Sequence, residues 1–456
     1  MASAEHTPAQ WRLRILLLSS ALASGAAWGA IGVSLASDAD ARPALTAHGG
    51  IGVVSLPTVL LTLSALPLGS LIGAPVLDFV SHTCGRRPAM LAGSALTVLG
   101  CLIATVEGPL LRTIGIGVVG LGMGGYAIVV PKLAHELAEH GHRRLMPRVR
   151  ATAPAGAALA VLAGALGALA SPSRAVICAW TIPLLVAMTS LLLALSLPET
   201  PHWFAAQGRV ETAYAALRRM VGELEAGVGI DWVMMDAGTR GEQHPLGRGD
   251  LSISRVRHTV IAGLLFELVQ ALPLGLAALC LGPALLVQAA EVTSGTPMAA
   301  PPIGATVALA SAWVAIALLG ARRHGDRLAY AWILGGTGLS ACGITLLALS
   351  GRAHGAGLVV LLIVVNALLV AGQFTAVVPA CTGGIDPLVP PWLLRSQRRA
   401  TAMIRPLVQL VAVIGPTLLL ALAPRPAVAL GAVLGCQMGS LLVAVSALPR
   451  ALAALH

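Results

Sequence analysis

Charged side chains are scarce in this sequence: Asp, Glu, Lys and Arg together make up 11% of its 456 residues, while 57% are hydrophobic. The mean hydropathy is +0.85. A soluble globular protein could not cover its surface with so few charges. The composition therefore excludes a soluble protein and predicts a chain that crosses a membrane many times.

Paired cysteines and catalytic groupings are also lacking. The seven cysteines show no CxxC spacing, so we interpret them as small buried hydrophobic residues rather than as disulfides or metal ligands. Three histidines share one polar loop with only Glu136 and Glu139 beside them, and we expect no metal site there. The three are His135, His140 and His142. With no nucleophile–base pair and no phosphate-binding loop, we expect neither an enzymatic activity nor a cofactor.

Aromatic and amide side chains are few: three Tyr, four Phe, eight Trp and a single Asn, Asn366. Pockets for small molecules use aromatic and apolar faces for contact and a few polar groups for orientation. We therefore expect any central cavity to be poor in both stacking surfaces and amides.

Long apolar runs, by contrast, are abundant. A membrane-spanning helix needs about 20 apolar residues, and twelve segments qualify, six on each side of a polar stretch at residues 197–222. Strands of a membrane barrel would show alternating segments of about ten residues, so we predict an all-α membrane protein with 12 transmembrane helices. The predicted spans are 15–36, 51–77, 88–106, 109–131, 151–170, 174–197, 258–282, 303–320, 328–350, 355–381, 401–423 and 427–447.

The polar stretch, LPETPHWFAAQGRVETAYAALRRMVG, divides the chain, and we call residues 197–222 the divider. It predicts an N-terminal six-helix bundle over 1–197, a cytoplasmic region over 198–256 and a C-terminal six-helix bundle over 257–456.

Inside that middle region, Pro198 ends the preceding helix because proline cannot extend a helix interior. Between Arg209 and Val221 the apolar residues fall on one side of a helix and Arg218 and Arg219 on the other, which predicts an amphipathic helix along the cytoplasmic face. Residues 223–256 are Gly-rich and mixed in charge, so we expect a loose linker there.

The net charge of +10 follows the predicted topology. If the N-terminus is cytoplasmic, the 29 Lys and Arg fall on the cytoplasmic side with few exceptions. The exceptions are Arg42, Arg112, Arg174, Arg352 and Arg425. This positive-inside bias predicts a multi-pass protein of the plasma or inner membrane with both termini cytoplasmic, and it gives no reason to expect a nucleic-acid partner.

Three stretches resemble motifs of the sugar porter family of the major facilitator superfamily. PETPHWFAAQGRVETAYAAL is similar to the family's PESPRW followed by Gly-Arg and a short helix. GLGMGGYAIVVPKLAHE is similar to its GxGxGG followed by Pro and Glu, and CGRRPAML resembles its loop between helices 2 and 3. The resemblance implies the superfamily fold, in which two six-helix bundles rock around a central cavity near the bilayer midplane.

The resemblance also implies a cytoplasmic gate, whose charged loops pair when the gate is closed and separate when it opens. Surface ion pairs contribute only about 0–1 kcal/mol each, so several of them suit a latch that must open reversibly. The expected gate residues are Asp78, Arg86, Arg87, Glu136, Arg143 and Glu199 in the first half and Asp386 and Arg395 in the second.

The chain departs from the family where the family couples transport to protons. The acidic residue of the first helix is Ala27 and the Arg before GxGxGG is Ile116. The Asp expected three residues before Gly-Arg-Arg is His82, while Asp78 lies one helical turn earlier. Of the family's helix 7 amides, only Gln270 remains.

One carboxylate lies deep in an apolar segment. Glu267 is roughly 14 Å into the predicted helix 258–282 by helical rise, near the middle of a hydrocarbon core about 30 Å thick. A carboxylate at that depth is a candidate site for carrying protons; the alternative is that it only solvates an inner vestibule. Gln270 is one turn away on the same face. We expect both to bind substrate together with Trp28, whose alternative role is packing.

We therefore predict a secondary active or facilitative transporter that moves a small polar solute, a sugar or polyol, by alternating access. Its expected partners are the solute, the lipid bilayer and, through Glu267, protons, and we expect a monomer. Two alternatives stay open. One is an exporter of apolar or cationic compounds, favoured by the scarcity of polar cavity residues. The other is a transport-inactive, transporter-like receptor or scaffold, which would explain an intact divider beside altered binding motifs.

Overall fold

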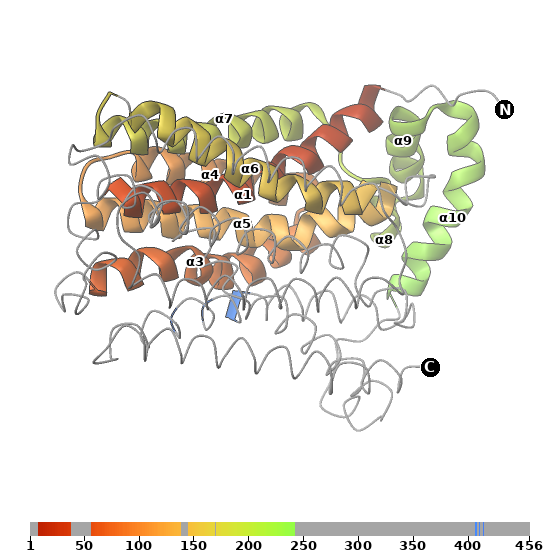
Figure 1. Cartoon of the computed structure of the whole chain (residues 1–456). Coiled ribbons are helices and arrows are strands. Elements are labelled where there is room, and N and C mark those ends of the chain that lie inside the picture. The colour runs from red at the N-terminus through yellow and green to blue at the C-terminus, as the bar shows by residue number, and fades with distance from the viewer. Residues whose placement is uncertain are drawn as a thin grey trace, which may run out of the picture.

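The computed structural model describes residues 8–37, 56–137, 145–168 and 170–241, together with residues 406, 407, 410 and 414. Figure 1 shows the long helices of the first half lying side by side. All six predicted first-half spans are confirmed as helices: α1 (Pro8–Ser37), α3 (Leu56–Thr83), α4 (Arg86–Ala104), α5 (Pro109–Leu137), α6 (Leu145–Ala168) and α7 (Pro172–Ser196).

Five of these helices are long and apolar enough to cross a membrane, and α6 contributes a shorter apolar stretch, Ala155–Ala168. The six spans predicted between 258 and 447 lie outside the described residues, apart from the four single positions above.

Several helices extend beyond their predicted spans, and two of these differences bear on the polar residues at the divider end. Helix α3 runs to Thr83, six residues beyond its predicted end at 77, and so includes Asp78. Helix α4 begins at Arg86 rather than at residue 88. Its first N–H groups find acceptors in the carboxylate of Glu199, and an acceptor at that position extends a helix N-terminus.

Close backbone approach joins the helices in pairs: α3 packs against α5, α4 against α5, and α1 against α6. Gly124 in α5 shows why the GxGxGG stretch needs glycine. A Cβ there would lie 2.5 Å from the backbone oxygen of Ser70 and 2.5 Å from the backbone nitrogen of Ala74, both in α3. Without side chains at such positions the helices can pack closely where lipid offers no hydrophobic drive for association.

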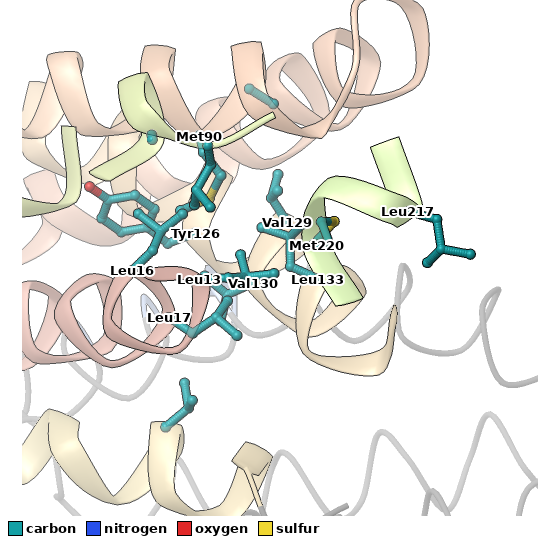
Figure 2. Packing of buried hydrophobic residues seen from close by; sticks show 14 of the residues in the cluster. Leu13, Leu16, Leu17, Met90, Tyr126, Val129, Val130, Leu133, Leu217 and Met220 are labelled. Atoms are coloured by element: carbon teal, nitrogen blue, oxygen red, sulfur yellow. The ribbon is translucent and has the colours of Figure 1, made fainter. Parts of the chain in front are cut away.

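The bundle has two main hydrophobic clusters. One contains Trp28, Ile116 and Trp180 among others. The other lies toward the divider and joins α1, α4, α5 and α7 to the helices of the divider. Figure 2 shows part of this second cluster, in which Met220 of α9 lies beside Val129 and Leu133 of α5.

Three further helices lie together at one end of the bundle, which we call the divider end: α8 (Pro201–Ala206), α9 (Val210–Val221) and α10 (Glu223–Gly241). In Figure 1, α9 and α10 run across the direction of the long helices. Helix α9 is amphipathic, as predicted, with Arg218 and Arg219 exposed. Its apolar face is buried against the bundle, through Ala213, Ala216, Leu217, Met220 and Val221.

The prediction of a loose linker from residue 223 is wrong for its first part, because Glu223–Gly241 is the helix α10. Gly222, with φ at 96°, ends α9 and turns the chain, a backbone conformation that glycine adopts without strain. Ala226 and Val233 lie on one helix face and are fully buried against the divider cluster. Residues 242–256 lie outside the described ranges.

Candidate functional site

Glu199 joins the divider to the start of α4. Its carboxylate accepts hydrogen bonds from the backbone N–H groups of Arg86 at 2.9 Å and Arg87 at 3.1 Å. It also accepts one from the N–H of Thr200 at 2.9 Å. A carboxylate at a helix N-terminus satisfies amides that have no partner within the helix and is favoured by the helix dipole.

Arg87 makes the reciprocal connection. Its Nε donates to the backbone oxygen of Ala194 at 3.1 Å, and its Nη2 donates to that of Leu195 at 2.7 Å. These carbonyls belong to the last turn of α7, where they have no partner within the helix. The N-terminus of α4 and the C-terminus of α7 are therefore each capped by a residue from the other segment. We call this pair of contacts the Glu199–Arg87 clasp.

Glu199 is partly buried. Burial raises the pKa of Glu199, while its backbone hydrogen bonds and the nearby charge of Arg86 lower that pKa by smaller amounts. Gly85, with φ at 116°, leaves room for this carboxylate, because a Cβ at Gly85 would collide with Oε2 of Glu199. Glycine at this position therefore serves both the backbone turn and the approach of Glu199.

Asp78 forms a separate polar cluster with α5. It is completely buried, and its Oδ1 lies 2.7 Å from Nζ of Lys132 and 3.5 Å from Nε2 of His82. The indole N–H of Trp203 in α8 donates to the backbone oxygen of His82 at 3.2 Å. This cluster therefore connects α3, α5 and α8.

Lys132 is not among the gate residues predicted from the sequence. Two signals were present: Lys132 follows Pro131 within a long apolar run, and Asp78 stands alone in another. A lone charge in a membrane helix usually has a partner on a neighbouring helix.

The predicted gate residues are thus only partly brought together. Glu199 meets Arg86 and Arg87 through backbone amides, whereas the Arg86 guanidinium donates to the backbone oxygen of Ser81 at 3.4 Å. Asp78 pairs with Lys132 instead. The backbone of Glu136 lies in α5 and its side chain is not described. Arg143, Asp386 and Arg395 lie outside the described residues.

Of the predicted substrate ligands, the structure describes only Trp28. It is 6% exposed and belongs to the hydrophobic cluster that also contains Trp180. Glu267 and Gln270 lie outside the described residues, as do His140 and His142.

The two positions where the family resemblance implies a proton-coupling pair lie in the same hydrophobic cluster as Trp28. Ala27 and Ile116 are both completely buried and belong to one hydrophobic cluster. Replacing a buried ion pair by well-packed apolar residues is often neutral or stabilising. The first bundle therefore accommodates the loss of this pair with apolar packing.

Replacing Lys132 with Met is expected to lower the free energy of unfolding by about 1–2 kcal/mol. The change leaves a buried carboxylate without its nearest cation; the cost stays below the 3–5 kcal/mol of a fully buried pair because Lys132 is partly exposed. Thermal unfolding in detergent measures it, with Lys132→Arg as the charge-preserving control. Equal melting temperatures for the wild type and Lys132→Met would show that the pair contributes nothing.

Comparison with known proteins identifies the class. The all-helical fold of this chain matches the xylose transporter XylE of Escherichia coli in a partially occluded inward-open conformation. The TM-score is 0.71 over 95% of this chain and 98% of that one, at 15% sequence identity. The same transporter bound to 6-bromo-6-deoxy-D-glucose matches with a TM-score of 0.69. The protein therefore has the major facilitator superfamily fold.

The family follows from the sequence match. Residues 10–382 match the family described as "Sugar (and other) transporter", and the chain belongs to that family. That family consists of multi-pass membrane proteins, in agreement with the fold.

Curated relatives are distant. The chain is 28% identical over 166 residues to "Sugar transporter ERD6-like 7" of Arabidopsis thaliana. It is 27% identical over 159 residues to the "Arabinose-proton symporter" of Escherichia coli. The aligned segments cover 34% and 33% of those two proteins.

Proposed function

We propose that this protein moves a small polar solute, a sugar or polyol, across the plasma or inner membrane by alternating access, with both termini cytoplasmic. The observation that carries the proposal is the match of residues 10–382 to the family of sugar and other transporters. The Glu199–Arg87 clasp supports the alternating-access part of it. The clasp connects the divider to the start of α4, and it connects α4 to the end of α7. The first bundle and the divider can therefore move as one unit.

The gate then operates between this unit and the second bundle. Glu136, Arg143, Asp386 and Arg395 are the proposed partners across that boundary. Asp78 and Lys132 act within the first bundle, because their contact joins α3 to α5.

An uptake panel in proteoliposomes tests the proposed substrate class. We expect flux of labelled sugars or polyols that saturates with concentration, with and without an imposed pH gradient. Efflux of apolar or cationic compounds without sugar flux would favour the exporter instead. A folded protein that moves none of these compounds would favour a receptor or scaffold.

The coupling ion is proposed to be a proton carried by Glu267, since Ala27 and Ile116 replace the family's charged pair. A carboxylate near the membrane centre is suited to alternate protonation. We propose that Gln270 and Trp28 complete the substrate site.

Replacing Glu267 with Gln is expected to remove the dependence of uptake on external pH, because the amide cannot release a proton. The measurement is initial uptake rate across a pH series in proteoliposomes. Glu107→Gln, a change at an exposed loop carboxylate, is the matched control. A pH profile in Glu267→Gln identical to that of the wild type would exclude Glu267 from coupling.

A further inference from the structure

A small cavity, partly open to its surroundings, lies where the divider meets the first bundle. Its volume, counted as the space open to the centre of a water molecule, is about 20 Å³; about 10–15 Å³ is enough for one water. The walls are apolar except at Arg87 and Thr200. Figure 2 shows wall residues from α1, α4, α5 and α9, among them Leu16, Met90, Leu133 and Met220.

Thr200 is unusual for its place in the chain. It is the N-cap of α8, where a threonine hydroxyl normally accepts a hydrogen bond from an N–H of the first helical turn, yet its side chain makes no capping bond. The residue is 5% exposed and its hydroxyl is buried without a protein hydrogen-bond partner. Buried hydroxyls in folded proteins almost always bond to protein or to ordered water.

Arg87 supplies the second polar group of the cavity. Its Nε and Nη2 bond to the last turn of α7, and a guanidinium has five N–H donors in all. A ligand that fits this cavity must be very small. It must accept a hydrogen bond from the Arg87 guanidinium and form another hydrogen bond with the Thr200 hydroxyl. Water meets all three requirements, whereas an apolar gas or a lipid chain would leave Thr200 unsatisfied.

We propose that this cavity binds one structural water molecule, which bridges the Thr200 hydroxyl and the Arg87 guanidinium. The water joins the divider to the bundle beside the Glu199–Arg87 clasp. A bridging water is nearly as favourable as a direct hydrogen bond, so it adds to the attachment of the divider to the first bundle.

Radiolytic footprinting of the full-length protein in detergent tests this site, because X-rays convert a bound water into a hydroxyl radical that oxidises neighbouring sulfur. Met90 lines the cavity and is 1% exposed, while Cys101 is 0% exposed and belongs to the other hydrophobic cluster. Each rate is divided by the rate of the same residue in the unfolded protein, because a thiol reacts with hydroxyl radical faster than a thioether. On this scale we expect Met90 to be oxidised faster than Cys101, with methionine sulfoxide as the product in the presence of dissolved oxygen. A normalised rate for Met90 no higher than that for Cys101 would show a dry cavity and overturn the proposal.

Two variants assign the water to Thr200. Thr200→Val keeps the shape and removes the hydroxyl, so the excess oxidation of Met90 should be lost; Thr200→Ser keeps the hydroxyl and should retain it. Full oxidation of Met90 in a folded Thr200→Val protein would mean that Thr200 does not hold the water. Even if Thr200→Val does not fold, the comparison of Met90 with Cys101 in the wild type tests whether the cavity holds a water.

Discussion

Replacing Glu199 with Ala is expected to lower the free energy of unfolding by about 2–3 kcal/mol. The change removes the acceptor of three backbone N–H groups, those of Arg86, Arg87 and Thr200. Hydrogen bonds to a charged acceptor contribute about 1.5–3 kcal/mol, and loss of a helix cap costs about 0.5–2 kcal/mol. Thermal unfolding in detergent, followed with a thiol-reactive dye, measures the loss.

Glu107→Ala is the control, because Glu107 is an exposed carboxylate in the loop between α4 and α5. It should leave the melting temperature unchanged within error. A loss in Glu199→Ala no larger than that in Glu107→Ala would contradict the role of the clasp.

The milder Glu199→Gln change tests whether the clasp also biases transport. An amide keeps one acceptor oxygen but places an NH₂ group against backbone donors, so the divider should loosen and the inward-open state should gain population. Cys84 is exposed at the end of α3 beside this contact and reports on it directly. We expect faster labelling of Cys84 by a membrane-impermeant maleimide from the divider side. Identical labelling rates in the wild type and the variant would show that the clasp stabilises the fold without affecting the population of the inward-open state.

Replacing Gly124 with Val is expected to cost about 3 kcal/mol and to reduce the yield of folded protein sharply. Overpacking a core costs about 1–3 kcal/mol, and more where no side chain can move aside. Here the obstructing atoms are backbone atoms of Ser70 and Ala74 in α3. Monodispersity in size-exclusion chromatography and the melting temperature are the readouts.

Gly117 provides the control on the same helix. A Cβ there would meet only the backbone oxygen of Ala65, at 3.8 Å, which is ordinary contact. Gly117→Ala should therefore be neutral or slightly stabilising, because alanine favours helix over glycine by about 1 kcal/mol. If Gly124→Ala behaved like Gly117→Ala, close packing of α3 on α5 would not explain the glycine.

The helices of the first half follow from composition and run length, because a backbone in lipid must satisfy its own hydrogen bonds. The family likewise follows from short motifs around the divider. The predictions that were wrong concern helix boundaries that depend on a contact with a residue far away in the chain. Helix α4 begins two residues early because Glu199 supplies an acceptor, and α10 forms because Ala226 and Val233 find a surface to pack against.

The predicted gate residues come from charges near loop ends, and their part in a gate stays a prediction. Which groups they contact depends on the tertiary structure. Glu199 accepts hydrogen bonds from the backbone amides of Arg86 and Arg87, and Asp78 of α3 pairs with Lys132 of α5. Sequence spacing does not reveal such partners, since they are 113 and 54 residues distant.

Hydropathy and local motifs are properties of short segments, so they were enough to identify a multi-pass helical membrane protein of the sugar transporter family. How the divider is attached depends on contacts between segments far apart in the chain. The Glu199–Arg87 clasp joins α4 to α7 and the divider. The Asp78–Lys132 pair joins α3 to α5, and the cavity beside Thr200 is lined from α1, α4, α5, α7 and α9. Buried polar groups must find partners there, and packing determines which partners lie within reach.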